Sequence, residues 1–251
     1  MAMYHRGMAC HGISSIIGAF DLPVLPMSAP TLPYQSVLFD LDGTLVDTAP
    51  DFIRVLNRLR ESYDRPALPH DVIRAVVSAG ARAMVQTGFP EHPVDSPEFA
   101  HIRQEFLDLY AQGLADESSL FDGMEGVLDK LEARGIPWGV VTNKPRVYSE
   151  PLLAGLSLSG RCAVLVCPDD VARTKPDPEP MYLACRQLAA DPLRSIYVGD
   201  HIRDIEAGRN AGMKTIAAGW GYVVAGEDPR DWRADLLAWQ VNDLNSLLDL
   251  N

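Results

Sequence analysis

Two aspartates, Asp40 and Asp42, stand one residue apart at the end of an apolar run and are followed at once by Gly43-Thr44. An extended strand points alternate side chains to the same side, so both carboxylates are expected at one strand tip. In open α/β sheets, ligands bind in the crevice at these carboxyl ends. Because neighbouring carboxylates repel each other, the pair predicts a site that also holds a cation and an anionic substrate.

Three later segments also carry polar groups suited to phosphate chemistry. Thr142 and Asn143 follow an apolar run and offer a hydroxyl group and backbone N–H groups. Asp200 ends another apolar run, and Asp204 comes one helical turn later on the same side. Lys175 lies in a loop stiffened by prolines. A parallel sheet would gather all of these side chains into one crevice.

The elements that position these residues follow from hydrophobic periodicity. Apolar side chains on one face predict three successive helices with no strand between them, at residues 49–63, 71–86 and 97–113. After the first strand at 37–42, short apolar runs predict strands at 137–142, 163–167, 195–199 and 214–218. Helical patterns alternate with these strands, at 124–134, 146–157, 178–189 and 203–211. The alternation predicts an α/β fold, a doubly wound, Rossmann-like parallel sheet with an inserted helical cap.

The same patterns predict the domain organisation. Residues 34–48 and 122–251 are expected to form the catalytic core, and residues 49–121 the helical cap. Residues 1–33 mix Gly, Ser, Pro and Met and are expected to be a disordered N-terminal extension. A start at Met27 or a signal peptide are the alternatives, although the region where a signal peptide would be cleaved is poor.

Composition limits the classes of partner. The chain has 251 residues and a formal net charge of -12, which argues against nucleic acid and anionic membranes as partners. No apolar run approaches the ~20 residues of a membrane span. The four cysteines show neither CxxC pairing nor zinc spacing, which indicates reduced thiols in a cytoplasmic protein: Cys10, Cys162, Cys167 and Cys185. A monomer and a homodimer are both compatible with the sequence.

The motifs, taken in order, resemble a known superfamily. Residues 40–44, then Thr142, then Lys175, then Gly199-Asp200 with Asp204 are similar to the four ordered motifs of the haloacid dehalogenase superfamily. The resemblance covers residues 36–250 approximately. The helical insertion directly after the first motif resembles the C1 cap found in phosphoglycolate phosphatases.

This resemblance implies a phosphatase mechanism. Asp40 would attack phosphorus and form an aspartyl-phosphate, which is readily hydrolysed. Asp42 would protonate the leaving alkoxide and then take a proton from the attacking water. Lys175 would neutralise charge on the phosphoryl group and on Asp40.

The resemblance also implies a Mg²⁺ cofactor, which prefers oxygen ligands. The implied metal-site residues are Asp40, Asp200, Asp42 through its backbone carbonyl, and Asp204, which would hold a metal-bound water or Lys175.

Substrate-binding residues are expected in both domains. Thr142 and the N–H of Asn143 would bind phosphoryl oxygens, and Thr44 completes the core set. In the cap, Gly80 can end or kink a helix and place Arg82 over the crevice, where an arginine would bind a carboxylate in bidentate fashion. The alternative for Arg82 is a surface position on an ordinary helix.

Simpler structural roles are open for single residues. Asp42 could serve only a turn, and Asp200 could be a helix N-cap. Asp204 could pair with Arg203 or Arg209 on a helix surface. The combined order of the motifs favours the catalytic interpretation.

The implied substrate is a small phosphomonoester that carries a carboxylate. Four stretches of the chain are similar to N-acetylmuramic acid 6-phosphate phosphatases of peptidoglycan recycling: residues 78–84, 138–145, 175–180, and the late Gly221-Tyr222 with Asp228-Pro229 and Trp232. A 2-phosphoglycolate phosphatase is the alternative. A phosphosugar mutase shares all four motifs and would be distinguished by slow phosphate release with isomer formation. A dehalogenase is disfavoured because that branch lacks an acid at the position of Asp42.

Overall fold

The computed structural model describes residues 1–2, 34–224 and 226–251. The chain divides into two units, Met1–Leu32 and Pro33–Asn251, and all the helices and strands described here lie in the second. The extension predicted for residues 1–33 falls outside the described residues, apart from the first two. Among the described residues, no helix is both long enough and apolar enough to cross a membrane.

A six-stranded sheet forms the centre of the second unit, and each neighbouring pair of strands is parallel. The spatial order is β5-β4-β1-β6-β7-β8, so the chain builds outward from β1 first in one direction and then in the other. This reversal puts a crevice at the carboxyl ends of the central strands. The strands are β1 Ser36–Phe39, β4 Trp138–Val141, β5 Val164–Val166, β6 Ser195–Gly199, β7 Lys214–Ala218 and β8 Leu236–Ala238.

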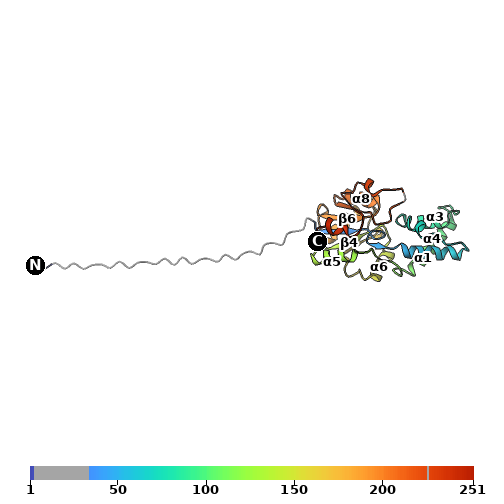
Figure 1. The fold of residues 1–251 in the computed structure, drawn as a ribbon, viewed down its shortest axis with the longest axis horizontal. Helices are drawn as coiled ribbons and strands as arrows, with labels where there is room; N and C mark the ends of the chain where they lie inside the picture. The colour runs from blue at the N-terminus through green and yellow to red at the C-terminus, as the bar shows by residue number, and fades with distance from the viewer. Residues whose placement is uncertain (3–33, 225) are drawn as a thin grey trace. The chain divides into compact units, whose positions relative to one another are not determined.

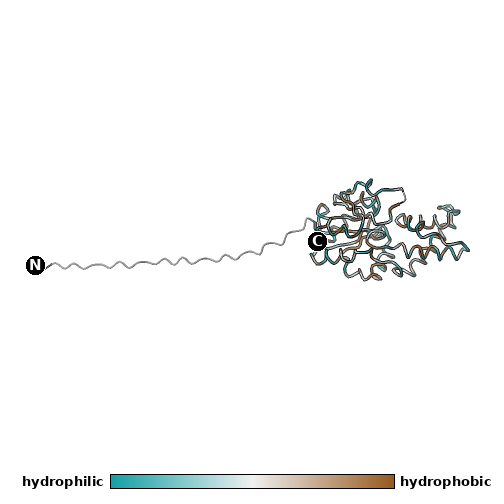
Figure 2. The backbone as a smooth tube through the Cα atoms, viewed as in Figure 1, coloured by the Kyte–Doolittle hydropathy of each residue, from teal (hydrophilic) through white to brown (hydrophobic). Residues whose placement is uncertain are grey.

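Helices cover the sheet, and the central strands are buried on both faces, as their unbroken apolar sequences require. On one face, Met181 of α7 and Ala207 of α8 pack against Leu38 and Tyr197 of the sheet. Figure 2 shows hydrophobic segments running along the strands in the interior. The helices that precede or connect these strands are α5 Met124–Ala133, α6 Arg146–Gly155, α7 Glu179–Leu188 and α8 Ile202–Asn210, and α9 Asp243–Leu247 follows the last strand.

Helices α1 to α4, inserted between β1 and β4, form a second hydrophobic cluster, which Tyr222 joins from the sheet side. In this cluster the rings of Phe52 and Tyr110 stack at 4.2 Å between centroids, which joins α1 to α4. Figure 1 shows α1, α3 and α4 side by side. The elements are α1 Ala49–Ser62, α2 His70–Arg74, the 3-10 helix η1 Val77–Ala79, α3 Gly80–Gly88 and α4 Pro97–Ala111.

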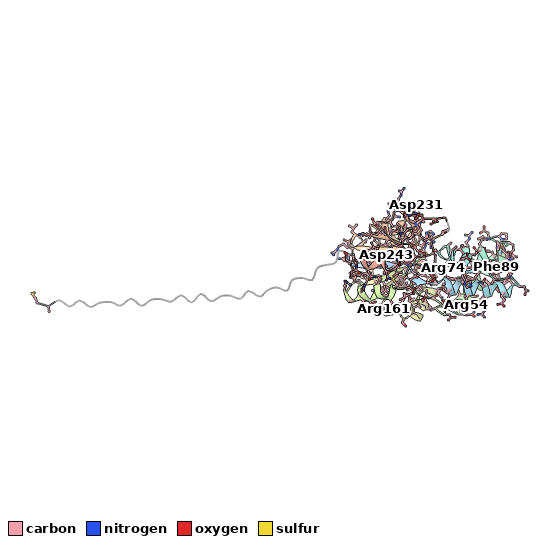
Figure 3. All side chains as sticks on the ribbon, in the orientation of Figure 1. Arg54, Arg74, Phe89, Arg161, Asp231 and Asp243 are labelled. Atoms are coloured by element: carbon pink, nitrogen blue, oxygen red, sulfur yellow. The ribbon has the colours of Figure 1, made fainter. Side chains whose placement is uncertain are left out.

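Two short segments lead into and out of this helical cluster. Strand β2, Val46–Asp47, pairs antiparallel with β3, Ser119–Leu120. Arg54 of α1, which is labelled in Figure 3, donates a hydrogen bond to the Gly113 carbonyl of the outgoing segment at 2.8 Å. The two linkers are therefore held together where the chain passes between its two hydrophobic clusters.

The prediction of one continuous helix over residues 71–86 is wrong. The chain forms α2, η1 and α3 instead, with Gly80 at φ 81°, a conformation that residues with a Cβ rarely adopt. Strand β1 also ends at Phe39, so Asp42 lies in a turn and not on the strand. Strands β2, β3 and β8 were not predicted, because each has only two or three residues and, unlike β5, none lies in a longer apolar run that the sequence analysis singled out.

Candidate active site

Asp40 lies immediately after β1 and is fixed by the backbone on both sides. Its N–H donates to the Val198 carbonyl at 2.9 Å, and its Oδ1 accepts from the Leu41 N–H at 2.8 Å. The residue is 5% exposed, and burial alone would raise the pKa of its carboxyl group. The Lys175 ammonium group, 2.8 Å from Oδ1, outweighs burial and lowers that pKa, so Asp40 is held ionised.

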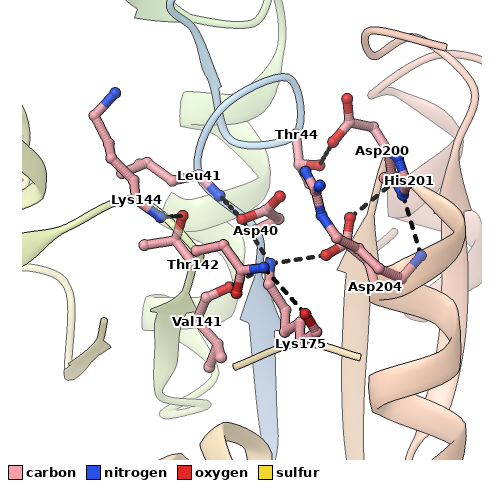
Figure 4. A network of polar contacts seen from close by, with 12 residues as sticks. Asp40, Leu41, Thr44, Val141, Thr142, Lys144, Lys175, Asp200, His201 and Asp204 are labelled. Carbon is pink, nitrogen blue, oxygen red and sulfur yellow. Dashed lines mark hydrogen bonds and ion pairs between the residues drawn. The ribbon is translucent and has the colours of Figure 1, made fainter. Parts of the chain in front are cut away.

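Lys175 is the buried cation at the centre of this arrangement (Figure 4). Its Nζ lies 2.8 Å from Asp40 and 2.7 Å from Asp204, and it donates to the Tyr197 hydroxyl at 2.9 Å. Burial tends to lower the pKa of Lys175, but the two carboxylates raise it above its usual value. The ammonium group therefore stays charged without contact with water.

Three carboxylates gather around this lysine. Oxygens of Asp40, Asp200 and Asp204 all lie within 4.8 Å of one another. Burial, and then repulsion by Asp40, raises the pKa of Asp200 to about 7; burial also raises that of Asp204 to about 6, against the effect of Lys175. Hard oxygen donors this close together fit a divalent cation, which would relieve their repulsion.

The Asp200 carboxylate is held from several sides. Oδ1 accepts from the Thr44 hydroxyl at 3.0 Å, and Oδ2 accepts from the Tyr222 N–H at 2.8 Å and from the Ser78 hydroxyl at 3.1 Å. A Cβ on Gly43 would come within 2.2 Å of Asp200 Oδ2, so the loop can approach this closely only with glycine. Thr44, predicted to bind substrate, lies instead against Asp200 and orients it.

Asp200 is not the N-cap of a helix, and Asp204 does not lie on a helix surface, so both alternative roles considered from the sequence are wrong. The N-cap of α8 is His201, whose Nδ1 accepts from the Arg203 N–H at 3.1 Å. Asp204 is fully buried: its Oδ1 contacts Lys175, and its Oδ2 accepts from the His201 N–H at 3.1 Å. Both carboxylates thus face the sheet crevice and not the helix surface.

Asp42 stands apart from the carboxylate cluster. Its Oδ1 accepts from the Thr48 hydroxyl at 2.7 Å and from the Lys144 ammonium group at 2.9 Å. Lys144 was missed from the sequence, although a second lysine two residues after Thr142 was a signal that could have found it. The Lys144 side chain is only 6% exposed, a degree of burial that is rare for lysine unless it is paired, and Asp42 is its partner here.

Thr142 and Asn143 occupy the tip of β4, as predicted. The Thr142 hydroxyl accepts from the Lys144 N–H at 3.1 Å, and the Asn143 side chain donates to the Lys175 carbonyl at 3.1 Å. The Asn143 Oδ1 is buried and has no hydrogen-bond partner among the described residues. Both residues border the same space as Asp40.

A cavity of about 370 Å³ joins the sheet crevice to the helical insertion. Gly80 and Arg82 line it, so the structure brings the predicted cap residues to the site. Arg82 lies at the rim, because its side chain is 68% exposed and its nearest carboxylate, on Asp95, is 3.8 Å away and fully open to solvent. Apolar residues form much of the remaining wall: Phe52, Val77, Met84, Leu107, Tyr110 and Tyr148.

Comparison with known proteins identifies the family. The family model described as haloacid dehalogenase-like hydrolase matches residues 37–218. The chain belongs to this family. The predicted membership and the predicted doubly wound parallel sheet are therefore confirmed. Phosphatases of this family generally depend on a metal ion, in agreement with the carboxylate cluster.

Individual relatives within the haloacid dehalogenase-like hydrolases are phosphatases. The chain is 47% identical over 215 residues to the N-acetylmuramic acid 6-phosphate phosphatase of Pseudomonas aeruginosa, covering 86% of this chain and 95% of that protein. It is 41% identical over 206 residues to the phosphoglycolate phosphatase of Xanthomonas campestris, covering 82% and 92%. The crystal structure of a predicted phosphoglycolate phosphatase from Haemophilus somnus has the same fold, with a TM-score of 0.77, 24% identity, and coverage of 86% and 99%.

Proposed function

We propose that the protein is a Mg²⁺-dependent phosphatase that hydrolyses N-acetylmuramic acid 6-phosphate through an aspartyl-phosphate on Asp40. The observation that carries this proposal is the cavity of about 370 Å³ that opens onto Asp40 and Asp42 and is lined by core and cap residues together. Its volume lies within the range of about 300–1,000 Å³ that is typical of sites for sugar-sized ligands. The similarity to phosphatases of that amino-sugar phosphate supports the same conclusion.

In the first step, the ionised Asp40 attacks phosphorus, forms the new P–O bond and expels the sugar alkoxide. Asp42 delivers a proton to that alkoxide and, in the second step, accepts one from the water that attacks the aspartyl-phosphate. Asp42 lines the cavity from the turn after β1, and because its Oδ1 already accepts from Thr48 and Lys144, its Oδ2 is the oxygen that can carry this proton. The products are the free sugar acid and inorganic phosphate.

The phosphoryl oxygens would bind at the tip of β4. The Thr142 hydroxyl and the Asn143 N–H are the donors, and Lys175 supplies positive charge beside Asp40. Four protein groups hold the Lys175 ammonium group in place. The lysine therefore needs little movement when negative charge develops on the phosphoryl group in the transition state.

Mg²⁺ fits the oxygen donors of this site, and when bound it would supply positive charge for the phosphoryl group. Asp40, Asp200 and the backbone carbonyl of Asp42 would hold it. Asp204 would act from one step further out, because both of its oxygens already have partners, Lys175 and the His201 N–H.

We assign residues 34–48 and 122–251 to the catalytic core and residues 49–121 to the cap. The separate hydrophobic cluster of the insertion and the β2–β3 pair at its base support this division. We also propose a cytoplasmic location, which agrees with the free thiols of Cys162, Cys167 and Cys185. A monomer or a homodimer remains the proposed assembly.

The alternative substrate is 2-phosphoglycolate, favoured by the second group of relatives. A two-carbon acid would leave most of the cavity and its apolar wall to water, so the amino-sugar acid fits better. A phosphosugar mutase is the third candidate and has no comparable support from the more similar relatives.

The test is phosphate release with Mg²⁺ from N-acetylmuramic acid 6-phosphate and from 2-phosphoglycolate, compared as kcat/KM. We expect a preference of about tenfold or more for the amino-sugar acid, equivalent to about 1.4 kcal/mol in transition-state binding. The opposite preference would assign the enzyme to the two-carbon acid. Slow phosphate release accompanied by an isomeric sugar phosphate would identify a mutase.

A further inference from the structure

Lys144 is a buried cation at the cavity for which the chemistry proposed above has no use. Its Nζ donates to Asp42 Oδ1 at 2.9 Å and to the Tyr110 hydroxyl at 2.7 Å. A lysine ammonium group carries three hydrogen-bond donors. The third has no protein partner within residues 34–224 and 226–251. The Lys144 ammonium group, which lines the cavity, therefore has one charged donor available for a ligand.

Tyr110 adds a second donor at the same place. Its hydroxyl oxygen accepts from Lys144, and no acceptor in the described part of the chain takes its proton. Burial, followed by the charge of Asp42, raises the pKa of Tyr110 well above 10, so the hydroxyl keeps this proton at neutral pH. Tyr110 comes from the last turn of α4, whereas Lys144 follows β4, so the two donors meet only where cap and core meet.

The surroundings of these donors are weakly polar. Lys144 Nζ lies 4.7 Å from the ring centroids of both Phe52 and Tyr110, and Tyr148 packs against Tyr110 at 5.8 Å. An ionic hydrogen bond is stronger in such an environment than in water. Figure 4 shows the Lys144 side chain extending away from Lys175, so the two lysines serve different ends of the site.

We propose that Lys144 and Tyr110 form a subsite that binds the carboxylate group of the substrate. The inference rests on the proposed phosphatase function and deepens it, because it limits the substrates to phosphomonoesters with a carboxylate that reaches Lys144 while the phosphoryl group lies at Asp40 and Lys175. Arg82, the carboxylate partner expected from the sequence, is 68% exposed at the rim, where solvent screens its charge. Lys144, at 6% exposure, is the better placed cation.

Two sugar phosphates test the subsite directly. N-acetylmuramic acid 6-phosphate and N-acetylglucosamine 6-phosphate differ only in the lactyl ether that carries the carboxylate. We would measure kcat/KM for both with the full chain and its Lys144→Met variant. Methionine keeps an unbranched chain against Phe52 and Tyr110 and removes the charge, and circular dichroism would check that the variant is folded.

We expect Lys144→Met to lower kcat/KM for the acid by about tenfold or more beyond any loss on the neutral sugar, because a charge-assisted hydrogen bond is lost only with the acid. Tyr110→Phe removes one hydroxyl group and should act in the same direction with a smaller ratio. Lys144→Arg keeps the charge and should retain part of the preference. Arg82→Ala, in the same assay, should change the ratio less than Lys144→Met.

If Lys144→Met lowers kcat/KM equally for the two sugar phosphates, the carboxylate subsite is overturned, and the role of Lys144 is to position Asp42. If the wild type hydrolyses 2-phosphoglycolate and neither sugar, the substrate proposal fails separately. The subsite is then judged with 2-phosphoglycolate and ethyl phosphate, which also differ by a carboxylate: a loss confined to the acid supports it, and an equal loss overturns it. A wild type that hydrolyses no carboxylated phosphomonoester would overturn both proposals.

Discussion

Replacing Lys175 with methionine should destabilise the metal-free protein strongly. Methionine fills a similar volume but leaves the buried carboxylates of Asp40 and Asp204 without the ammonium group that lies 2.8 and 2.7 Å from them. Asp200 adds a third carboxylate to the same cluster. The variant therefore retains three buried acids and loses the counter-charge of two of them, Asp40 and Asp204.

The size of the effect follows from the burial of this ion pair. The Lys175 and Asp204 side chains are both 0% exposed, and the Asp40 side chain is 7% exposed, so water cannot replace the lost contacts. Removing one partner of a buried pair typically costs about 3–5 kcal/mol. For a chain of this size, that corresponds to a fall in Tm of about 6–20 °C.

The assay is thermal or urea unfolding with EDTA, followed by circular dichroism, beside a phosphatase assay. Lys214→Met is the matched control, because Lys214 is an exposed lysine at the start of β7 and should change stability by no more than about 0.5 kcal/mol. Adding Asp204→Asn to Lys175→Met should recover part of the loss, since it removes one of the uncompensated charges. A loss below about 1 kcal/mol in Lys175→Met would refute the reasoning that this lysine compensates the cluster.

Two further predictions concern the same residues. Asp40→Asn should abolish turnover while leaving the circular dichroism spectrum unchanged, because Lys175 keeps its contact with Asp204; near-wild-type turnover would contradict the nucleophile. The rise in Tm on adding Mg²⁺ should be larger at pH 8 than at pH 5. Burial raises the pKa of Asp200 to about 7 and that of Asp204 to about 6, so without metal these groups stabilise the fold at low pH and lose that contribution as pH rises through those values. Metal needs the ionised carboxylates, and an equal shift at both pH values would remove them from the metal site.

The central sheet could be predicted because its strands are buried on both faces. Burial requires unbroken apolar runs such as those of β1, β4 and β6, and such runs are visible in the sequence alone. The polar residues at their tips were predicted for the same reason, since parallel strands bring their carboxyl ends to one edge. Asp40, Thr142 and Lys175 accordingly meet at one site in the structure.

Contacts between segments far apart in the sequence could not be predicted in this way. Thr44 orients Asp200 across 156 residues, and Lys144 reaches Asp42 across 102 residues. No local pattern records either partner, because a threonine or lysine in a loop has the same sequence whether it faces solvent or a carboxylate. The break at Gly80 was visible only as a possible kink, since the backbone angle depends on how the cap packs over the site.

The arrangement of charge in the site explains how a chain with a net charge of -12 can bind a substrate with two anionic groups, a phosphoryl group and a carboxylate. Lys175 lies between two carboxylates, Asp40 and Asp204, whose charge exceeds its own, so it cannot by itself attract a phosphoryl group. Oxygens of Asp40, Asp200 and Asp204 crowd within 4.8 Å of one another beside the place where the phosphoryl group must bind, so the approach of phosphate depends on the divalent cation that Asp200 would help to hold. Lys144 is paired with a single carboxylate, Asp42, and has one donor without a partner among the described residues, so it is a buried cation to which a second anionic group can bind. The phosphoryl group and the carboxylate thus require different cations, and this separation is the physical basis on which the cavity can distinguish a carboxylated sugar phosphate from a neutral one.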